Sequence, residues 1–278
     1  QLGFQSVVWT QLGVKIGLWV AYALLMALTG FVSAWLAIRA RPDSADGSTI
    51  RINGDVVEVG KSVSSKTARR VAVVISLIVG VIFGSQFNAN WSEILLMFNA
   101  QSFGTTDPQF GLDNGFYVFV LPGLKLVLAA VAMLLGVGLV FSVVTHVLMG
   151  GIRITMPVNG RGLFSITKRC RRQLGIWLML NMFAWAVRQM IGVFDQLTVQ
   201  GSRITGASYT AVHANIPVTF IMAALTAILG VVLGIWLMRS HTLEGQASIG
   251  VRASAALKAW RVPVTSIAVV VVVGLVLT

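Results

Sequence analysis

Residues 121–149 read LPGLKLVLAAVAMLLGVGLVFSVVTHVLM, an apolar run in which Lys125 is the one Lys, Arg, Asp or Glu. A helix that crosses the hydrocarbon core of a bilayer needs about 17 to 25 such residues. Further apolar stretches of spanning length lie at 14–38, 71–87, 174–193, 216–238 and 262–278. The stretches 71–87 and 262–278 are near the lower limit of that range. The sequence therefore predicts an all-α, polytopic membrane bundle with about six spans.

The overall composition excludes a soluble monomer. The chain is 56% hydrophobic and 11% charged, with a mean hydropathy of +0.84, whereas soluble domains carry about 25% charged residues. Its single cysteine, Cys170, makes no internal disulfide, and we interpret it as an incidental free thiol. Because the chain starts at Gln1 and ends within an apolar run at Thr278, we interpret both ends as truncated.

The basic residues predict the orientation of the spans. Seventeen of the 21 Lys and Arg residues lie in the segments 39–70, 150–173 and 239–261. Such loops stay cytoplasmic, because cations are costly to move across a membrane. The segments 88–120 and 194–215 are then exterior connections of a protein inserted in the plasma membrane. The basic excess of these loops equals the net charge of +12, so topology explains it and no nucleic-acid partner is needed.

The first basic loop contains a signal for a β-hairpin. Residues 49–52 and 56–59 are rich in β-branched residues, and Asn53-Gly54 lies between them. An Asn-Gly pair in this setting is a strong hairpin signal, although an isolated hairpin is only marginally stable in water. The loop 39–70 therefore contains either a β-hairpin or an irregular surface segment.

The exterior connection 88–120 contains a helical pattern too short to span. Trp91, Ile94, Leu95 and Phe98 recur at the spacing of one helical face. We expect residues 91–98 to form an interfacial helix, with Trp91 at the depth of the lipid headgroups. Its apolar face would pack on residues 103–121, so that 88–120 forms an exterior cap.

Two glycine pairs predict close helix packing. Gly80 with Gly84, and Gly230 with Gly234, are separated by one helical turn, and small residues at this spacing let helices in lipid approach closely.

The most distinctive stretch is 103–122, FGTTDPQFGLDNGFYVFVLP. Asp107-Pro108 and Asp113-Asn114-Gly115 are turn-forming sequences. Phe116, Tyr117 and Phe119 lie just before a span, where aromatic residues at the membrane interface are expected. A second stretch, GASYTAVHANIP at 206–217, contains Tyr209 and His213 and leads into the next apolar run.

These two stretches resemble the motifs of a large uncharacterised family of multi-pass membrane proteins from actinobacteria, cyanobacteria and other bacteria. The family shows FG-x-x-DP-x-FG-x-D-x-x-FY-x-F-x-LP, and later GA-x-YTD-x-x-A-x-LP before a span. Ala211 stands where the second motif usually has Asp, so a role for that carboxylate is not carried over. The resemblance implies a block of about seven spans followed by a large extracytoplasmic domain, of which this chain lacks the first span and the domain.

Neither the residues nor the resemblance supplies a catalytic or cofactor site. His146, His213 and His241 fall at different depths or sides, so no metal cluster is expected. Asp107 and Asp113 could form a carboxylate pair outside the membrane, but their neighbours favour a role in capping turns. We therefore expect no enzyme activity and no cofactor, and we retain Asp107, Asp113, Tyr117, Tyr209 and His213 as candidate polar residues of the two motifs.

Arg188 is the charged residue placed deepest in an apolar run. Asn181, Arg188 and Asp195 recur every seven residues, so they share roughly one helical face. They form either a polar seam along a pathway or a packing face with a locally paired arginine. We expect a partner within hydrogen-bonding reach of the guanidinium: a carbonyl cluster, ordered water, or one of the acids Asp195, Asp107, Asp113 and Glu93.

The function favoured by these observations is that of a membrane anchor and assembly core. It would present an extracytoplasmic domain or partner subunit. We expect it to contact the lipid bilayer and other protein subunits, and to form an oligomer or part of a larger complex. A transporter or channel subunit is the alternative, which a polar cavity between the spans would favour.

Overall fold

The computed structural model describes residues 5–40, 48–52, 55–59, 64–154, 164–198 and 206–239. Its helices of eight or more residues are α1 (Gln5–Arg39), α2 (Ser65–Ala89), α3 (Trp91–Phe98), α4 (Leu121–Leu148), α5 (Lys168–Gly192) and α6 (Ile216–Arg239). Single turns of other helix types are η2 (Phe116–Val120), η3 (Val193–Leu197) and η4 (Ala211–Asn215). The strands are β1 (Ser48–Ile52), β2 (Asp55–Val59), β3 (Ile152–Ile154) and β4 (Phe164–Ile166).

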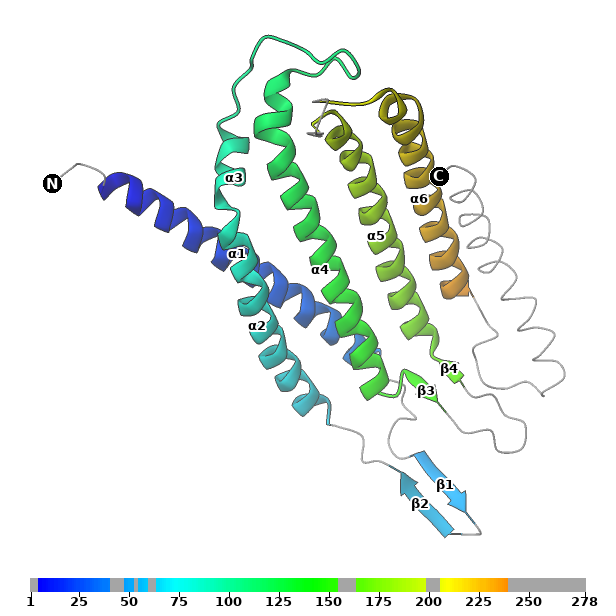
Figure 1. Ribbon diagram of the computed structural model, residues 1–278. Coiled ribbons are helices and arrows are strands. Elements are labelled where there is room, and N and C mark those ends of the chain that lie inside the picture. Colours follow the sequence, from blue (N-terminus) through cyan, green and yellow to red (C-terminus); the bar gives the residue numbers. More distant parts are fainter. Residues whose placement is uncertain are drawn as a thin grey trace.

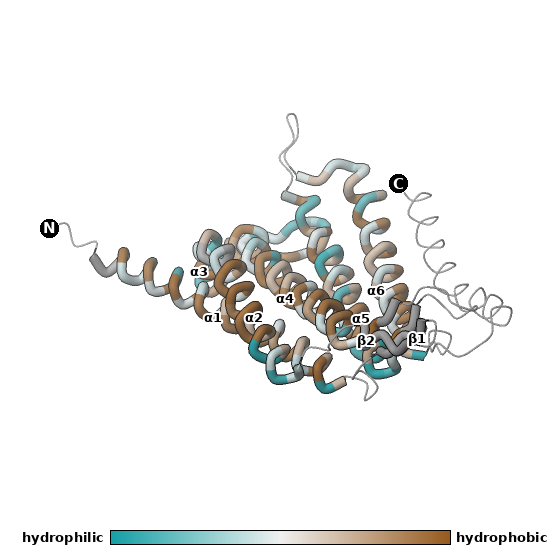
Figure 2. The backbone as a smooth tube through the Cα atoms, turned by 90° about the horizontal axis from the view of Figure 1, so that it is seen from below, coloured by the Kyte–Doolittle hydropathy of each residue, from teal (hydrophilic) through white to brown (hydrophobic). Residues whose placement is uncertain are grey.

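The predicted all-α bundle is confirmed. Within the described ranges, five helices are long and apolar enough to cross a membrane. Helices α1, α2, α4, α5 and α6 contain the predicted spans 14–38, 71–87, 121–149, 174–193 and 216–238, apart from Met149 and Val193, which follow the ends of α4 and α5. The sixth predicted span, 262–278, lies outside the described residues. Figure 2 shows hydrophobic residues along most of α1, α2 and α4, and a more mixed surface on α5.

Most of the long helices lie side by side in a row, and one tilted helix crosses part of that row. In Figure 1, α2, α4, α5 and α6 lie side by side in this order, and α1 crosses α2 and α4 obliquely. Helix α1 packs on α2 and α4, while α5 packs on α4 and α6. One end of the bundle carries α3 and the connection to α4; we call residues 91–120 the cap and this end the cap end. The opposite end carries the strands and is called the hairpin end.

The glycine pairs allow the close packing that the sequence predicts. A Cβ atom on Gly80 would lie 2.5 Å from the carbonyl oxygen of Ala23, and one on Gly84 would lie 2.9 Å from the Ala23 side chain. Added Cβ atoms on Gly230 and Gly234 would collide with Met182 and Met179. Larger residues at these four glycines would therefore separate α1 from α2, and α5 from α6.

Helix α5 begins earlier than the apolar pattern predicts. It begins at Lys168 rather than at 174, and the Thr167 hydroxyl accepts a hydrogen bond from the Cys170 N–H. The segment 150–173, expected as a loop, therefore ends in two turns of helix. Arg171 on these turns is only 1% exposed. Hydropathy detects the lipid-facing length of a helix, and it misses polar turns that are covered by protein.

Of the two alternatives for the loop 39–70, the structure contains the β-hairpin. Strands β1 and β2 are antiparallel, and Ile52 pairs with Asp55, so the connection consists of the two residues Asn53 and Gly54. A second hairpin, β3 with β4, was not predicted, because its strands are only three residues long, too short for an alternating pattern to be recognised.

The short helix predicted at residues 91–98 is present, but its packing differs in part from the prediction. Ile94 is buried, and α3 packs on η2 and the first turns of α4. A Cβ atom on Gly123 of α4 would lie 2.9 Å from both Glu93 and Met97. Phe98, expected on the packed face, is instead 76% exposed, because the helix ends there and the chain turns away.

Candidate functional site

The cap is held together by two aspartates. The carboxylate of Asp107 accepts hydrogen bonds at Oδ1 from the backbone N–H groups of Gln109 (2.8 Å) and Phe110 (2.7 Å). At Oδ2 it accepts from the Leu112 N–H (3.0 Å) and the Tyr117 hydroxyl (2.8 Å). Desolvation raises the pKa of Asp107, but these four hydrogen bonds together hold that pKa below its ordinary value.

The carboxylate of Asp113 also accepts four hydrogen bonds from the cap. Its Oδ2 accepts from the Ser102 hydroxyl and the Gly104 N–H, and its Oδ1 accepts from the N–H groups of Phe103 and Gly115. The Ser102 hydroxyl is the largest of the influences that lower the pKa of Asp113 to about 2. Gly104 has a φ of 69°, a left-handed conformation that favours glycine at this turn.

This geometry decides between the two interpretations of the aspartates. An ionised carboxylate has about four acceptor sites, and Asp107 and Asp113 each fill four with donors from the cap itself. They cap turns, as the neighbouring residues predicted, and keep no acceptor site for a metal ion or a reacting group. In the described ranges, no group of three His, Cys, Asp or Glu side chains could hold a metal.

Aromatic rings tie the cap to the end of α5. The ring of Phe194 in η3 makes edge-to-face contacts with Phe110, Phe116 and Tyr117, at centroid distances of 5.0, 5.4 and 6.4 Å. Such pairs contribute about 0.5–1.5 kcal/mol each beyond burial. The first motif thus specifies a folded turn structure that binds to the connection between α5 and α6.

The second motif begins the turn before α6. The rings of Tyr209 and His213 stack with centroids 4.0 Å apart, and His213 Nδ1 lies 3.1 Å from the Tyr209 carbonyl oxygen. Tyr209 remains 77% exposed. Both residues lie at the cap end, as the sequence predicts. The described contacts of Tyr209 and His213 are local ones, within the turn that leads into α6.

Asp195 binds a different cation from the one expected. Its carboxylate lies 2.8 Å from the Lys125 ammonium at the start of α4. The side chains are 47% and 39% exposed, so the pair lies at the surface of the cap end. Since Asp107 and Asp113 are saturated by the cap, none of these three acids is available to Arg188. Among the described residues, no hydrogen bond or ion pair to Arg188 is found.

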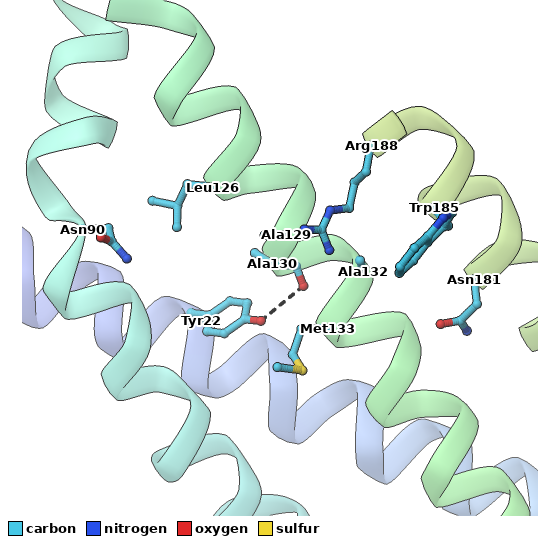
Figure 3. Close-up of a pocket in the computed structure, with 10 residues that line it drawn as sticks. All are labelled: Tyr22, Asn90, Leu126, Ala129, Ala130, Ala132, Met133, Asn181, Trp185 and Arg188. Carbon is cyan, nitrogen blue, oxygen red and sulfur yellow. Dashed lines mark hydrogen bonds between the residues drawn. The ribbon is translucent and has the colours of Figure 1, made fainter. Parts of the chain in front are cut away.

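Arg188 instead lines a cavity of about 420 Å³ between α1, α4 and α5. Figure 3 shows the guanidinium directed toward α4, Trp185 beside it, and Tyr22 on the opposite wall. The complete lining is Tyr22, Asn90, Leu126, Ala129, Ala130, Ala132, Met133, Asn181, Trp185 and Arg188.

The structure thus brings together two of the three residues of the predicted seam. Asn181 and Arg188 both line the cavity, whereas Asp195 lies about 10.5 Å further along the helix axis and pairs with Lys125. The Asn181 amide donates to the carbonyl oxygens of Leu135 (3.1 Å) and Trp177 (2.8 Å). Trp185 was not predicted as part of the seam, although its spacing from Asn181 and Arg188 places it on the same face.

A second polar cluster lies near the hairpin end and was also not predicted. The Gln173 amide donates to the Ser142 hydroxyl and to the Ser33 carbonyl oxygen, both at 2.9 Å, and its Oε1 lies 3.0 Å from His146 Nε2. His146 is 1% exposed. No sequence signal could have found this cluster, because it joins residues of α1, α4 and α5 that are distant along the chain.

A comparison with known protein families identifies the family of this chain. The sequence model of the uncharacterised protein family UPF0182 matches residues 1–278. The chain belongs to this family. The resemblance inferred from the two motifs is therefore confirmed. No solved structure matches.

Relatives in UPF0182 are much longer than this chain. A UPF0182 protein of Bifidobacterium adolescentis is 76% identical over 278 residues, which cover 100% of this chain and 26% of that protein. A UPF0182 protein of Kocuria rhizophila is 35% identical over 237 residues, 84% of this chain and 23% of that protein. One from Corynebacterium diphtheriae is 31% identical over 236 residues, 83% and 23% respectively. The chain spans about a quarter of the length of these curated relatives.

Proposed function

We propose that this chain is the membrane-embedded core of a longer protein, and that its cap end holds an extracytoplasmic domain or a partner subunit. The observation that carries the proposal is the state of the cap. Its two aspartates are saturated internally, so it is a folded platform, while Phe98, Phe103 and Tyr209 are 76%, 50% and 77% exposed. Exposed aromatic rings on an ordered surface are typical of protein–protein contacts.

The length of the relatives supports this assignment. This chain covers about a quarter of them, so a full-length protein has ample chain to form a domain over the cap. The described contacts of the first motif serve to fold residues 102–117 into the cap. A core that orders a docking surface without a reactive group fits an anchoring role.

The charge distribution supports an orientation with the cap outside a bacterial plasma membrane. Arg39, Arg69, Arg70, Lys168 and Arg239 all lie at the hairpin end of their helices, and basic segments stay cytoplasmic. In a Cys170→Ser background, Gln109→Cys should react with a membrane-impermeant maleimide in intact cells. Ser64→Cys should react only after permeabilisation, and the reverse pattern would show that the cap faces the cytoplasm.

Site-specific photo-crosslinking in the full-length protein tests the anchoring role. A photoreactive benzoylphenylalanine in place of Phe103 should crosslink to residues outside 1–278 or to a second protein, as identified by mass spectrometry. The matched control is the same group at Val144, which is 50% exposed on the opposite half of α4 and should crosslink mainly to lipid. If Phe103 also gives only lipid adducts, the cap is not a docking platform.

The cavity beside Arg188 favours a second candidate function, that of a transporter or channel subunit. The cavity is partly polar and lies between helices, where substrate sites of membrane proteins are found. Flux of a small anion into proteoliposomes that contain the full-length protein tests this candidate. Flux that is lost in Arg188→Gln would support transport, and its absence in the wild type would remove this alternative.

A further inference from the structure

We propose that the cavity beside Arg188 binds the phosphate group of an anionic membrane lipid, with the acyl chains lying outside the cavity along the apolar helix surface. This inference is independent of the anchoring role and of the orientation of the bundle.

The lining of the cavity carries a positive charge. Arg188 is the one charged side chain in the lining, and the lining contains no carboxylate. Asp195, which lies on the same helical face, pairs with Lys125. The cavity therefore presents an uncompensated cation to whatever fills it. A cation at membrane depth is costly unless it faces an anion, a polar group or water, so the favoured occupant is an anion.

Arg188 also supplies the cavity with hydrogen-bond donors. A guanidinium presents five N–H donors in a planar fork that matches the oxygens of a phosphate. The other described amide of α5 in the lining, that of Asn181, already donates to Leu135 and Trp177. Arg188 is thus the group in the lining best suited to recognise the occupant, and it selects for an oxyanion.

Much of the remaining lining is apolar. Leu126, Met133 and Trp185 line the same space, and Trp185 is 57% exposed, so its ring extends beyond the cavity. A freely soluble anion would gain nothing from these surfaces. An amphiphile would place its charged group at Arg188 and its apolar part along Leu126, Met133 and the Trp185 ring.

The depth and the size of the cavity also fit the headgroup of a lipid. Arg188 lies about 10.5 Å along the helix axis from Asp195, and the Lys125–Asp195 pair marks the polar surface of the cap end. A long arginine side chain at this depth lies within reach of the headgroup layer. A volume of about 420 Å³ is too small for a whole phospholipid, so the acyl chains extend beyond the cavity along Trp185 and Met133, which are 57% and 37% exposed.

Native mass spectrometry of the full-length protein tests the proposal. The delipidated protein in detergent is titrated with phosphatidylglycerol, with zwitterionic phosphatidylcholine as the comparison lipid. We expect retention of one phosphatidylglycerol, and a loss of affinity of about tenfold or more in Arg188→Gln, which is typical of the removal of a charge-assisted bidentate contact. Arg188→Lys should recover only part of that affinity, because it keeps the charge and loses the planar fork.

Two further variants separate the site from general effects. Ala129→Phe fills the cavity without changing any charge, and it should weaken lipid retention as Arg188→Gln does. Lys15→Gln removes a cation that lies 5.3 Å from the Trp91 ring, outside the cavity, and should leave retention unchanged. Thermal unfolding of each apo variant identifies any that fails to fold.

Several results would overturn the proposal. One is equal retention of phosphatidylglycerol by wild type and Arg188→Gln. Another is complete displacement of the lipid by millimolar inorganic phosphate, which would assign the site to a free anion. A third is a carboxylate from outside residues 1–278 found crosslinked at Arg188, which would assign the cavity to the rest of the full-length chain.

Discussion

Charged side chains have internal hydrogen-bond partners in the cap, whereas in the cavity beneath it none is described. In the cap, Asp107 and Asp113 each accept four hydrogen bonds from their own turns. In the cavity, by contrast, Arg188 lines an open space of about 420 Å³. A polar group that is satisfied internally specifies structure, whereas one that lacks an internal counterpart is able to bind something else.

This difference changes the meaning of the sequence motifs. The stretch 103–122 is the most distinctive part of the chain, and its conspicuous aspartates fold the cap and keep no free acceptor. Arg188 belongs to no motif, and it is the residue suited to binding. The distinctive sequence of 103–122 therefore reflects the requirements of a complicated turn. The candidate ligand site is found instead from the structure, by identifying the charged side chain that has no partner among the described residues.

The largest expected effect tests the cap as a packed unit. Phe194→Ala removes the ring that contacts Phe110, Phe116 and Tyr117, and should lower stability by roughly 2–3 kcal/mol, since a half-buried aromatic is deleted. Thermal unfolding in detergent measures the change. Phe183→Ala, at a 62% exposed position, is the control and should have little effect. Equal losses in the two variants would show that the cap is not held by Phe194.

A smaller effect is expected from acid. The pKa of Asp113 in the folded cap is about 2, below its ordinary value of 3.8. A depressed pKa means that the carboxylate stabilises the cap fully above about pH 4, and that this contribution is lost as the pH falls through about 2. The amide resonance of Gly104, which donates to Asp113, should report this transition in NMR spectra. Asp113→Asn should abolish it, and a midpoint at or above pH 4 would contradict the hydrogen-bond pattern of the cap.

The smallest effect compares the two cations directly. Lys125→Met leaves Asp195 unpaired and should cost up to about 1 kcal/mol, because the pair is partly exposed. Arg188→Met in the delipidated protein should cost nothing measurable, since no described partner is lost. Melting temperatures of both variants provide the measurement, with Lys125→Met/Asp195→Asn as the compensating control. A larger loss for Arg188→Met would reveal an internal partner and remove the distinction between cap and cavity.

The sequence was sufficient for features governed by local patterns. The helix at 91–98 has its expected bounds because four apolar residues share one face, and the hairpin at 49–59 follows from Asn53-Gly54. The spans within the described residues follow from long apolar runs. The start of α5 was misplaced, because Lys168 and Arg171 made its first turns look like a loop.

Features that depend on tertiary contacts could not be predicted in this way. Lys125 and Asp195 are 70 residues apart, so no spacing rule joins them, and the nearer Arg188 was the natural expectation. The hydrogen bond from Tyr22 to the Ala130 carbonyl oxygen spans 108 residues and helps to form a cavity wall. The sequence located Arg188 and Asn181, but the opposite wall of their cavity is supplied by helices far away along the chain.

The glycine contacts described above have a consequence for how the molecule assembles in the bilayer. Gly80 and Gly84 join α1 to α2, and Gly230 and Gly234 join α5 to α6, so the chain contains two helical hairpins that can insert as pairs. Helix α4 packs on α1 of one pair and on α5 of the other. The cavity takes its walls from α1, α4 and α5 and therefore exists only after both pairs have joined α4. A lipid bound at Arg188 would, by mass action, favour the finished bundle over its half-assembled precursors.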